Sequence, residues 1–316
     1  MKQTLYLGKP GIISVKGQTL SFIDKDKNKK DYPVKEIEKI VCLSPISITS
    51  GTTKLLAKEN IPVYFVNKFG VLYNTLEPLN FTISGKVTIE QVKFFLEKRV
   101  ELAKLFVLGT YFNLKGFFKR YNFDLKDYLD EIKNSKCVGE LMGYESLIWK
   151  ESYFLLSKIV GFEFEKRTKR PPKNELNALI SFLNTLLYTD LINQGRLTYL
   201  NLSISFLHEP QDSRFSLVLD IAEIFKPVIV FPLITYLLNK KVLTKEDFER
   251  LGEGVLLNKN GKKKVLINYE KKMNETIKVR SLGKKVRYRT LLKLEFYKII
   301  KHLLSDKNYE PYKHNF

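Results

Sequence analysis

Short runs of alternating apolar and polar residues fill the first quarter of the chain, and turn residues separate them. Apolar residues at every second position are typical of strands with one buried face. Strands are expected at residues 4–7, 11–16, 19–23, 39–43, 46–48 and 62–66. One short helix is expected at residues 52–59, with Ser50 near its N-cap. The pattern predicts a small β domain, a sandwich or partial barrel, over residues 1–75.

Beyond residue 75 the apolar residues change to helical spacing. Residues 76–87 show no clear period and are expected to form a linker. Thr88 and Gln91 then resemble a capping box, in which two side chains satisfy backbone donors at a helix start. Helices are expected at residues 88–120, 125–133, 137–160, 173–194, 215–240, 244–251 and 286–305. The sequence therefore predicts a multidomain α+β protein, with an N-terminal β-sandwich domain and an all-α domain at residues 88–316.

Length and composition narrow the class further. The chain has 316 residues, of which 44% are hydrophobic, as in folded globular proteins. Cys42 and Cys137 belong to no CxxC or Cys/His cluster, so neither a disulfide framework nor a structural zinc site is expected. The N-terminus has no apolar signal-peptide core, and the longest apolar run, residues 228–238, is too short to cross a bilayer. We expect a soluble cytoplasmic protein with no membrane contact.

The charge of the chain indicates a polyanionic partner. Lys and Arg total 54 against 34 acids, a net charge of +20. Residues 259–289 hold twelve basic and two acidic residues, about half of the excess. A lysine-rich solvated surface is the alternative, but such surfaces usually balance Lys with Glu. A second basic stretch, residues 167–173, precedes an expected helix, although a solvated loop explains it equally well. The candidate phosphate contacts are Arg167, Lys169, Arg170, Lys173, Lys284, Lys285, Arg287 and Arg289.

Glu145 is a carboxylate within an apolar helical stripe. Four apolar residues lie three or four positions away on the same helical face. They are Leu141, Met142, Ile148 and Trp149. Because an isolated buried carboxylate is costly, Glu145 requires a cation. That cation is either a bound metal or an Arg or Lys of another helix.

Asp220 and Glu223 are a second acidic feature, spaced i, i+3 on one helical face with almost entirely apolar flanks. Two like charges there call for a cation, with salt bridges to a neighbouring helix as the alternative. His208 ends another apolar segment, where it is either a ligand or a hydrogen-bonded core residue. Carboxylates with one imidazole suit Mg²⁺ or Mn²⁺, and the absence of thiolates argues against zinc. An acidic metal site in a basic protein is what an enzyme of nucleic-acid phosphodiesters needs.

Two long segments closely resemble the CRISPR-associated integrase family, the first of the two universal spacer-acquisition proteins. They are KRPPKNELNALISFLNTLLYTDLI (residues 169–192) and FLHEPQDSRFSLVLDIAEIFKPVI (residues 206–229). Shorter matches are ENIPVYFVNKFG, LAKLFV, GYES, NYEKKM and YRTLLKLEFYKIIKHL. The resemblance thus covers nearly the whole chain, and the combination of RPP, NALxSF and FLHEP with SLVLDIAE is highly specific.

The resemblance implies a β domain used for dimerisation and an α-helical catalytic domain. It implies homodimers, two of which assemble on a small ferredoxin-like partner, the second universal adaptation protein. It also implies a divalent metal bound by Glu145, His208 and Glu223. The family often has aspartate where Glu223 stands, so Asp220 is expected to share the catalytic role. Ser146 replaces the glycine that usually follows the glutamate.

The function that we expect is metal-dependent transfer of DNA strands into a CRISPR array, with double-stranded DNA as the substrate. A 3′-hydroxyl attacks a phosphodiester, while Mg²⁺ or Mn²⁺ polarises the phosphate and stabilises the leaving 3′-oxygen. One alternative is a nuclease of branched DNA with no CRISPR role. Another is a non-catalytic nucleic-acid-binding scaffold whose acidic residues form buried salt bridges.

Overall fold

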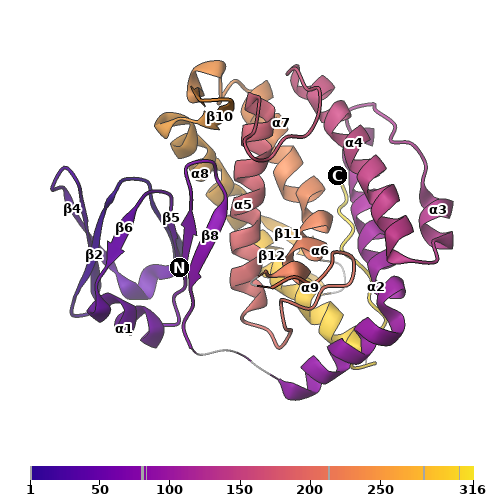
Figure 1. Ribbon diagram of the computed structural model, residues 1–316, viewed down its shortest axis with the longest axis horizontal. Helices are drawn as coiled ribbons and strands as arrows, with labels where there is room; N and C mark the ends of the chain where they lie inside the picture. The colour runs from indigo at the N-terminus through magenta and orange to yellow at the C-terminus, as the bar shows by residue number, and fades with distance from the viewer. Residues whose placement is uncertain (1, 80–81, 83, 213, 280–281, 306) are drawn as a thin grey trace. The chain divides into compact units, whose positions relative to one another are not determined.

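The structure is a computed structural model that describes residues 2–79, 82, 84–212, 214–279, 282–305 and 307–316 (Figure 1). The chain divides into two compact units, Met1–Phe81 and Thr82–Phe316. The first is mostly strands and the second mostly helices, which confirms the expected α+β class. The division falls inside the linker expected at residues 76–87. No helix in the described ranges is long and apolar enough to span a membrane.

The described part of the first unit contains two four-stranded mixed sheets, one α-helix and a 3₁₀ turn at Val34–Glu36. One sheet has the order β1-β5-β7-β8 and the other β4-β3-β2-β6. Their bounds are β1 Gln3–Leu7, β2 Gly11–Lys16, β3 Thr19–Asp24, β4 Lys29–Pro33, β5 Ile37–Cys42, β6 Ile46–Ile48, β7 Val63–Val66 and β8 Leu72–Leu76. A single buried cluster draws side chains from both sheets, among them Leu7, Ile13 and Val63. The helix α1 (Ser50–Lys58) is capped by Thr49, which accepts a hydrogen bond from the Thr52 N–H, one residue before the expected cap.

The six expected strands are present, with ends shifted by at most two residues. The sequence did not predict β4 and β8. Each is the last strand of its sheet, and most of its side chains are exposed or half-buried. An edge strand of this kind needs no apolar alternation, so it leaves little signal in the sequence.

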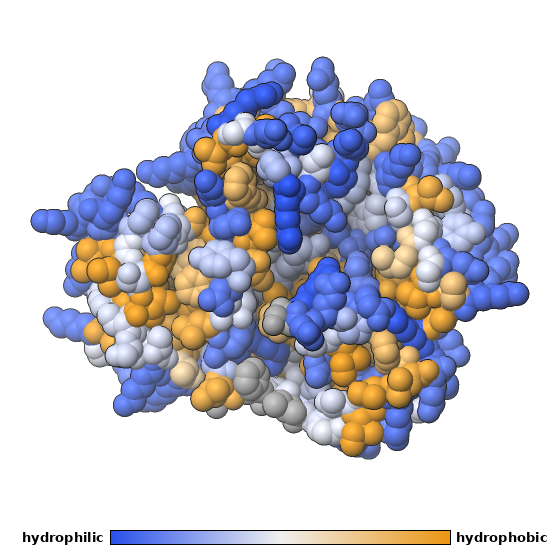
Figure 2. Space-filling view, viewed as in Figure 1, coloured by the Kyte–Doolittle hydropathy of each residue, from blue (hydrophilic) through white to orange (hydrophobic). Residues whose placement is uncertain are grey.

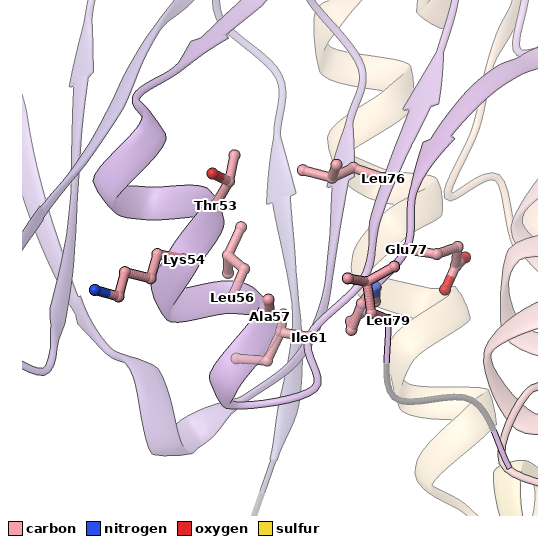
Figure 3. A pocket seen from close by; sticks show the side chains of 9 residues that line it. Thr53, Lys54, Leu56, Ala57, Ile61, Leu76, Glu77 and Leu79 are labelled. Atoms are coloured by element: carbon pink, nitrogen blue, oxygen red, sulfur yellow. The ribbon is translucent and has the colours of Figure 1, made fainter.

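A shallow hollow of about 270 Å³ lies in the first unit beside α1. Figure 3 shows Leu56 and Ile61 on one side of it and Leu76 and Leu79 on the other. Leu79 is 86% exposed.

The second unit is built from long helices and two hairpins. The helical segments are α2 Gly85–Lys119, α3 Leu129–Asn134, α4 Val138–Val160, α5 Glu175–Gly195, α6 Ser216–Phe225, the π-helical Lys226–Val230, α7 Phe231–Asn239, α8 Lys259–Asn274 and α9 Tyr288–Leu303. The hairpins are β9 Phe248–Leu251 with β10 Gly254–Leu257, and β11 Thr276–Val279 with β12 Lys284–Arg287. The helix α6 contacts α5 on one side and α2 on the other (Figure 1).

Two predictions for this unit are corrected. The unit is not all-α, because two hairpins interrupt the helices. In the range expected to be a helix at residues 244–251, a 3₁₀ turn covers Lys245–Asp247 and strand β9 covers the last four residues. Helix α8 was not expected. It buries a single narrow stripe, Val265, Tyr269 and Met273, and its remaining face is rich in lysine, so its apolar period is weak.

The start of α2 also differs from the expectation. Ser84, and not Thr88, caps the helix by accepting a hydrogen bond from the Val87 N–H. Gln91 is therefore no part of a capping box and is buried.

Near its N-terminal end, α2 exposes apolar side chains that are spaced three and four residues apart. Figure 2 shows apolar side chains gathered over this part of the unit. The helix has a non-helical residue, Lys98, at a kink in its middle.

The C-terminal residues fold back onto α2 and α6. Asn113 of α2 donates to the carbonyls of Tyr312 and Ile224, and the ring of Tyr312 stacks on Phe225 at 5.7 Å. A Cβ at Gly109 would lie 2.6 Å from Pro311, so the glycine allows the tail to pack directly on α2. The tail thereby supports α6 next to its acidic residues.

Candidate active site

The Asp220 carboxylate organises the loop that carries His208. Asp220 lies on α6 and is fully buried. Its Oδ2 accepts the N–H groups of Phe206 and Leu207 at 2.7 and 3.0 Å. Its Oδ1 accepts the N–H of His208 at 2.9 Å and lies 2.8 Å from Nδ1 of the same residue. Because a carboxylate accepts, Nδ1 donates, and in the neutral ring Nε2 keeps its lone pair. Asp220 therefore orients His208, and both of its oxygens are already engaged.

The pKa of His208 depends on its burial and on the neighbouring carboxylates. Burial favours its neutral form, but the hydrogen bond and charge of Asp220 act in the opposite direction. The carboxylates of Glu223 and Glu145 add to that effect, and the pKa of His208 is raised overall. The carboxylates of all three acidic residues therefore act on one imidazole.

Glu223 is paired with a lysine that follows it on the same helical stretch. Its Oε1 lies 2.5 Å from Nζ of Lys226, and both side chains are buried. Its Oε2 is buried without a hydrogen-bond partner. Lys226 begins the π-helical turn, and Pro227 has no N–H to donate to the carbonyl four residues earlier. The turn thus places a cation directly beside the acidic face of α6.

Glu145 of α4 lies half-buried near the same charges. Burial is the main reason that its pKa is raised to about 7, and the charge of Glu223 raises it further. The positive charges of Lys226 and His208 act in the opposite direction. The structure thus brings Glu145, His208 and Glu223, which are distant in sequence, into one electrostatic cluster.

Helix α2 holds the His208 loop from the opposite side. Arg99 Nε donates to the carbonyl of Phe206 at 2.8 Å, and its Nη2 contacts Glu209 Oε2 at 2.7 Å. Gln91 Nε2 donates to the carbonyls of Asn201 and Ile204, both at 2.9 Å. The backbone of the loop is therefore fixed from α2 as well as from α6.

The basic stretch at residues 167–173 separates into two kinds of side chain. Arg167 is half-buried, donates to Asn177 Oδ1 at 2.9 Å and to Ser181 Oγ at 2.8 Å, and ties the stretch to α5. Lys169, Arg170 and Lys173 are exposed. Partial burial lowers the pKa of Lys169, as do the charges of Lys226 and Arg167. Glu223 and Glu145 also act on Lys169, so its ammonium lies near the acidic cluster.

The second group of expected DNA contacts lies around β12. Lys284 and Lys285 are exposed and Arg287 is half-buried. Arg289 is 6% exposed, with Nε 3.1 Å from Asp190 and Nη2 2.6 Å from Glu270. The prediction that Arg289 contacts DNA is corrected, because its guanidinium is buried in a salt-bridge network. Its place at the buried start of α9 explains the difference.

The donor set fits a hard divalent cation in its chemistry. Two carboxylates and one imidazole with a free Nε2 are ligands of Mg²⁺ and Mn²⁺. The unpartnered Oε2 of Glu223 is an orphaned buried acceptor. Within the part of the chain that the structure describes, however, no three His, Cys, Asp or Glu side chains are already closed around a common point as a metal site. Lys226 takes up one of the two oxygens of Glu223.

From the sequence, no site role was expected for Lys226 or Arg99, and Gln91 was assigned only to a capping box. The ion pair of Lys226 could have been predicted, because a lysine three residues after an acid on an apolar helix indicates one. The contacts of Arg99 and Gln91 could not, because their partners lie more than 100 residues away along the chain.

The fold and the site define a two-part α+β protein with an acidic and histidine cluster in its helical unit. The profile of the family described as "CRISPR associated protein Cas1" matches residues 5–271. The CRISPR-associated endonuclease Cas1 of Methanothermobacter thermautotrophicus is 39% identical over 317 residues, covering 98% of this chain and 95% of that protein. The chain belongs to the Cas1 family.

Solved structures have the same fold. A Cas1 protein from Thermotoga maritima superposes with a TM-score of 0.90 at 32% identity, covering 97% of this chain and 99% of that one. A casposase bound to integration product gives 0.87 at 22% identity, with 98% and 93% covered. A Cas6-RT-Cas1–Cas2 complex gives 0.83 at 17% identity, with 99% of this chain and 36% of that one covered. The last two likenesses concern the fold alone.

Proposed function

We propose that the chain is a divalent-metal-dependent DNA integrase and endonuclease that inserts short DNA fragments into a CRISPR array by 3′-hydroxyl transesterification. The observation that carries the proposal is the cluster of Glu145, His208 and Glu223, with His208 oriented by Asp220. Membership of the Cas1 family supports it.

In this proposal Mg²⁺ or Mn²⁺ would be held by the carboxylates of Glu145 and Glu223 and by Nε2 of His208. When bound, it would supply a Lewis acid for the scissile phosphate and the leaving oxygen. Asp220 acts as a positioning residue in place of the ligand role left open from the sequence, because its oxygens already accept the loop N–H groups. Arg99 supports the same loop through the Phe206 carbonyl.

The reaction exchanges one phosphodiester for another. The donor 3′-oxygen forms a bond to phosphorus, the bond from phosphorus to the target 3′-oxygen breaks, and the proton lost by the donor hydroxyl balances the one gained by the leaving oxygen. With water in place of the donor, the same site hydrolyses the strand. Lys169 is exposed and experiences the charges of Glu223 and Glu145, which supports a role in contacting the substrate phosphate.

Double-stranded DNA is the proposed substrate, as protospacer and as CRISPR repeat. The proposed partners are a second copy of the chain and the small ferredoxin-like second adaptation protein. Two strand transfers at the ends of one duplex need two sites at a fixed separation, which a dimer provides. A solved protein of the same fold is part of a Cas6-RT-Cas1–Cas2 complex, which supports the proposal of a second adaptation protein as partner.

Donor-end chemistry tests the proposal directly. A short duplex with 3′-hydroxyl ends should be joined to a plasmid that carries a CRISPR repeat, in the presence of Mn²⁺ and the second adaptation protein. A 3′-dideoxy donor of the same sequence should give no joined product, because it has no attacking oxygen. Product formed equally from both donors would contradict integration, and cleavage alone would favour a nuclease.

The exposed lysines of β12 provide a test of the DNA surface. Lys284→Ala with Lys285→Ala should weaken binding to unrelated duplexes alike, because phosphate contacts carry no sequence information. The slope of log affinity against log salt should fall by about 0.9 for each lost contact. Fluorescence anisotropy over a salt series measures it, and an unchanged slope would place the DNA elsewhere.

One observation favours a second candidate function. The buried pair of Glu223 with Lys226 is the kind of salt bridge that a non-catalytic DNA-binding scaffold would use. The orphaned Oε2 of Glu223 and the raised pKa of Glu145 argue for the enzyme, because neither carboxylate is fully neutralised by protein groups. Equilibrium Mn²⁺ binding separates the two candidates.

A further inference from the structure

A lysine ammonium occupies the position where the acidic cluster needs positive charge. The side chain of Lys226 is 8% exposed and that of Glu223 is 6% exposed. Their contact uses only Oε1 of Glu223, and Oε2 remains buried without a partner. The lysine therefore neutralises Glu223 while leaving one of its oxygens available to another electrophile.

Aromatic rings near Lys226 can stabilise its ammonium in positions other than its contact with Glu223. Its Nζ lies 5.1 Å from the ring centroid of Trp149 on α4 and 5.8 Å from that of Tyr188 on α5. Aromatic faces attract an ammonium without requiring a fixed hydrogen-bond geometry. The ammonium can thus shift away from Glu223 and still keep favourable contacts.

We propose that Lys226 is the resident counter-cation of the metal-free site, and that it gives up its contact with Glu223 when a divalent ion binds. The inference rests on the proposed metal site. Lys226 is a positioning residue in this scheme, and its charge sets the affinity of the site for metal.

The charges decide the direction of the effect. Without metal, Lys226 stabilises a buried carboxylate that would otherwise be unpaired. With metal, two cations share that carboxylate and repel each other across a few ångströms of low-dielectric interior. Lys226 therefore favours the folded metal-free protein and opposes metal binding.

The test is Lys226→Met, which keeps most of the volume of the side chain and removes the charge. In EDTA we expect the Tm to fall by about 10 °C, the size typical of one broken buried pair. In Mn²⁺ titrations by calorimetry we expect at least about tenfold tighter binding than in the parent. The rise in Tm on adding Mn²⁺ should also be larger than in the parent.

A matched control separates this role from simple destabilisation. Lys264 of α8, whose side chain is more exposed than that of Lys226, also forms a pair, 2.7 Å long, with a buried carboxylate, that of Asp247. Lys264→Met should lower the Tm without tightening Mn²⁺ binding. In a Glu223→Gln background, Lys226→Met should add nearly nothing to Mn²⁺ affinity, because the carboxylate for which lysine and metal compete is gone.

A conservative variant keeps the test decisive if Lys226→Met does not fold. Lys226→Arg retains the charge, and its guanidinium can donate two hydrogen bonds to Glu223. Mn²⁺ binding by this variant should therefore weaken. Unchanged or weaker Mn²⁺ binding by folded Lys226→Met, or tighter binding by Lys226→Arg, would overturn the inference. A parent protein that binds no Mn²⁺ would overturn the proposed metal site itself.

Discussion

Glu145→Gln, His208→Ala and Glu223→Gln should each lower the rate of strand transfer by at least about 1000-fold. A bound metal contributes several kcal/mol of transition-state stabilisation, and every 1.4 kcal/mol corresponds to about tenfold in rate. Single-turnover joining of a 3′-hydroxyl donor at saturating Mn²⁺ measures the loss. DNA affinity should remain nearly intact, since the proposed phosphate contacts are made by other side chains.

The metal-free stability of Glu145→Gln is the control for folding. Burial and Glu223 raise the pKa of Glu145 to about 7, from an ordinary value of 4.5. The folded protein thus holds this proton more tightly than the unfolded chain, and that stabilising contribution is lost as pH rises from about 4.5 through about 7. Glutamine carries no charge to bury, so at pH 8 in EDTA the variant should melt no lower than the parent. Full activity in such a folded variant would refute the assignment.

Asp220→Asn should behave differently from the three proposed ligands. Asparagine has one acceptor oxygen, so it can accept either from the Phe206 and Leu207 N–H groups or from His208, while its NH2 donor faces the other side; it also loses the charge that faces His208 Nδ1. Loss of such a supporting partner typically costs about 10–100-fold in metal affinity or activity. A loss as complete as that of Glu145→Gln would indicate that Asp220 is itself a ligand.

The sequence predicted the central strands, the long helices and the acidic cluster because each leaves a local pattern. Strand β2 alternates, α5 is apolar over most of its length, and Asp220 and Glu223 share one helical face. Edge strands such as β4 left no such pattern. The sequence also could not show that Asp220, and not Glu223, accepts the N–H groups of the loop at residues 206–208. That difference depends on how the loop folds back onto α6.

The surroundings of individual basic residues also could not be predicted from the sequence. Charge density correctly marks a basic segment, but it does not distinguish a solvated arginine from a buried one. Arg287 and Arg289 are two positions apart, one half-buried on β12 and the other enclosed by Asp190 and Glu270. The tertiary contacts of α9 with α5 and with α8 distinguish the two positions.

Arg289→Leu should lower the free energy of unfolding by about 3–5 kcal/mol, the cost of leaving a buried charge without its partner. Asp190 is fully buried, and its carboxylate also accepts a hydrogen bond from the Tyr269 hydroxyl at 2.7 Å. Scanning calorimetry should show a Tm decrease of roughly 6–20 °C for a unit of this size.

Arg287→Leu is the matched control, because it removes the same side chain two positions earlier. Its effect on stability should stay within about 0.5 kcal/mol, as for most exposed or half-buried positions. Its effect on DNA should be the larger one, with a salt slope reduced by about 0.9 if Arg287 contacts a phosphate. Arg289→Leu should leave that slope unchanged at temperatures where the protein is folded. A stable Arg289→Leu protein with a reduced slope would return Arg289 to the DNA surface and would contradict the buried network as the reason for its position.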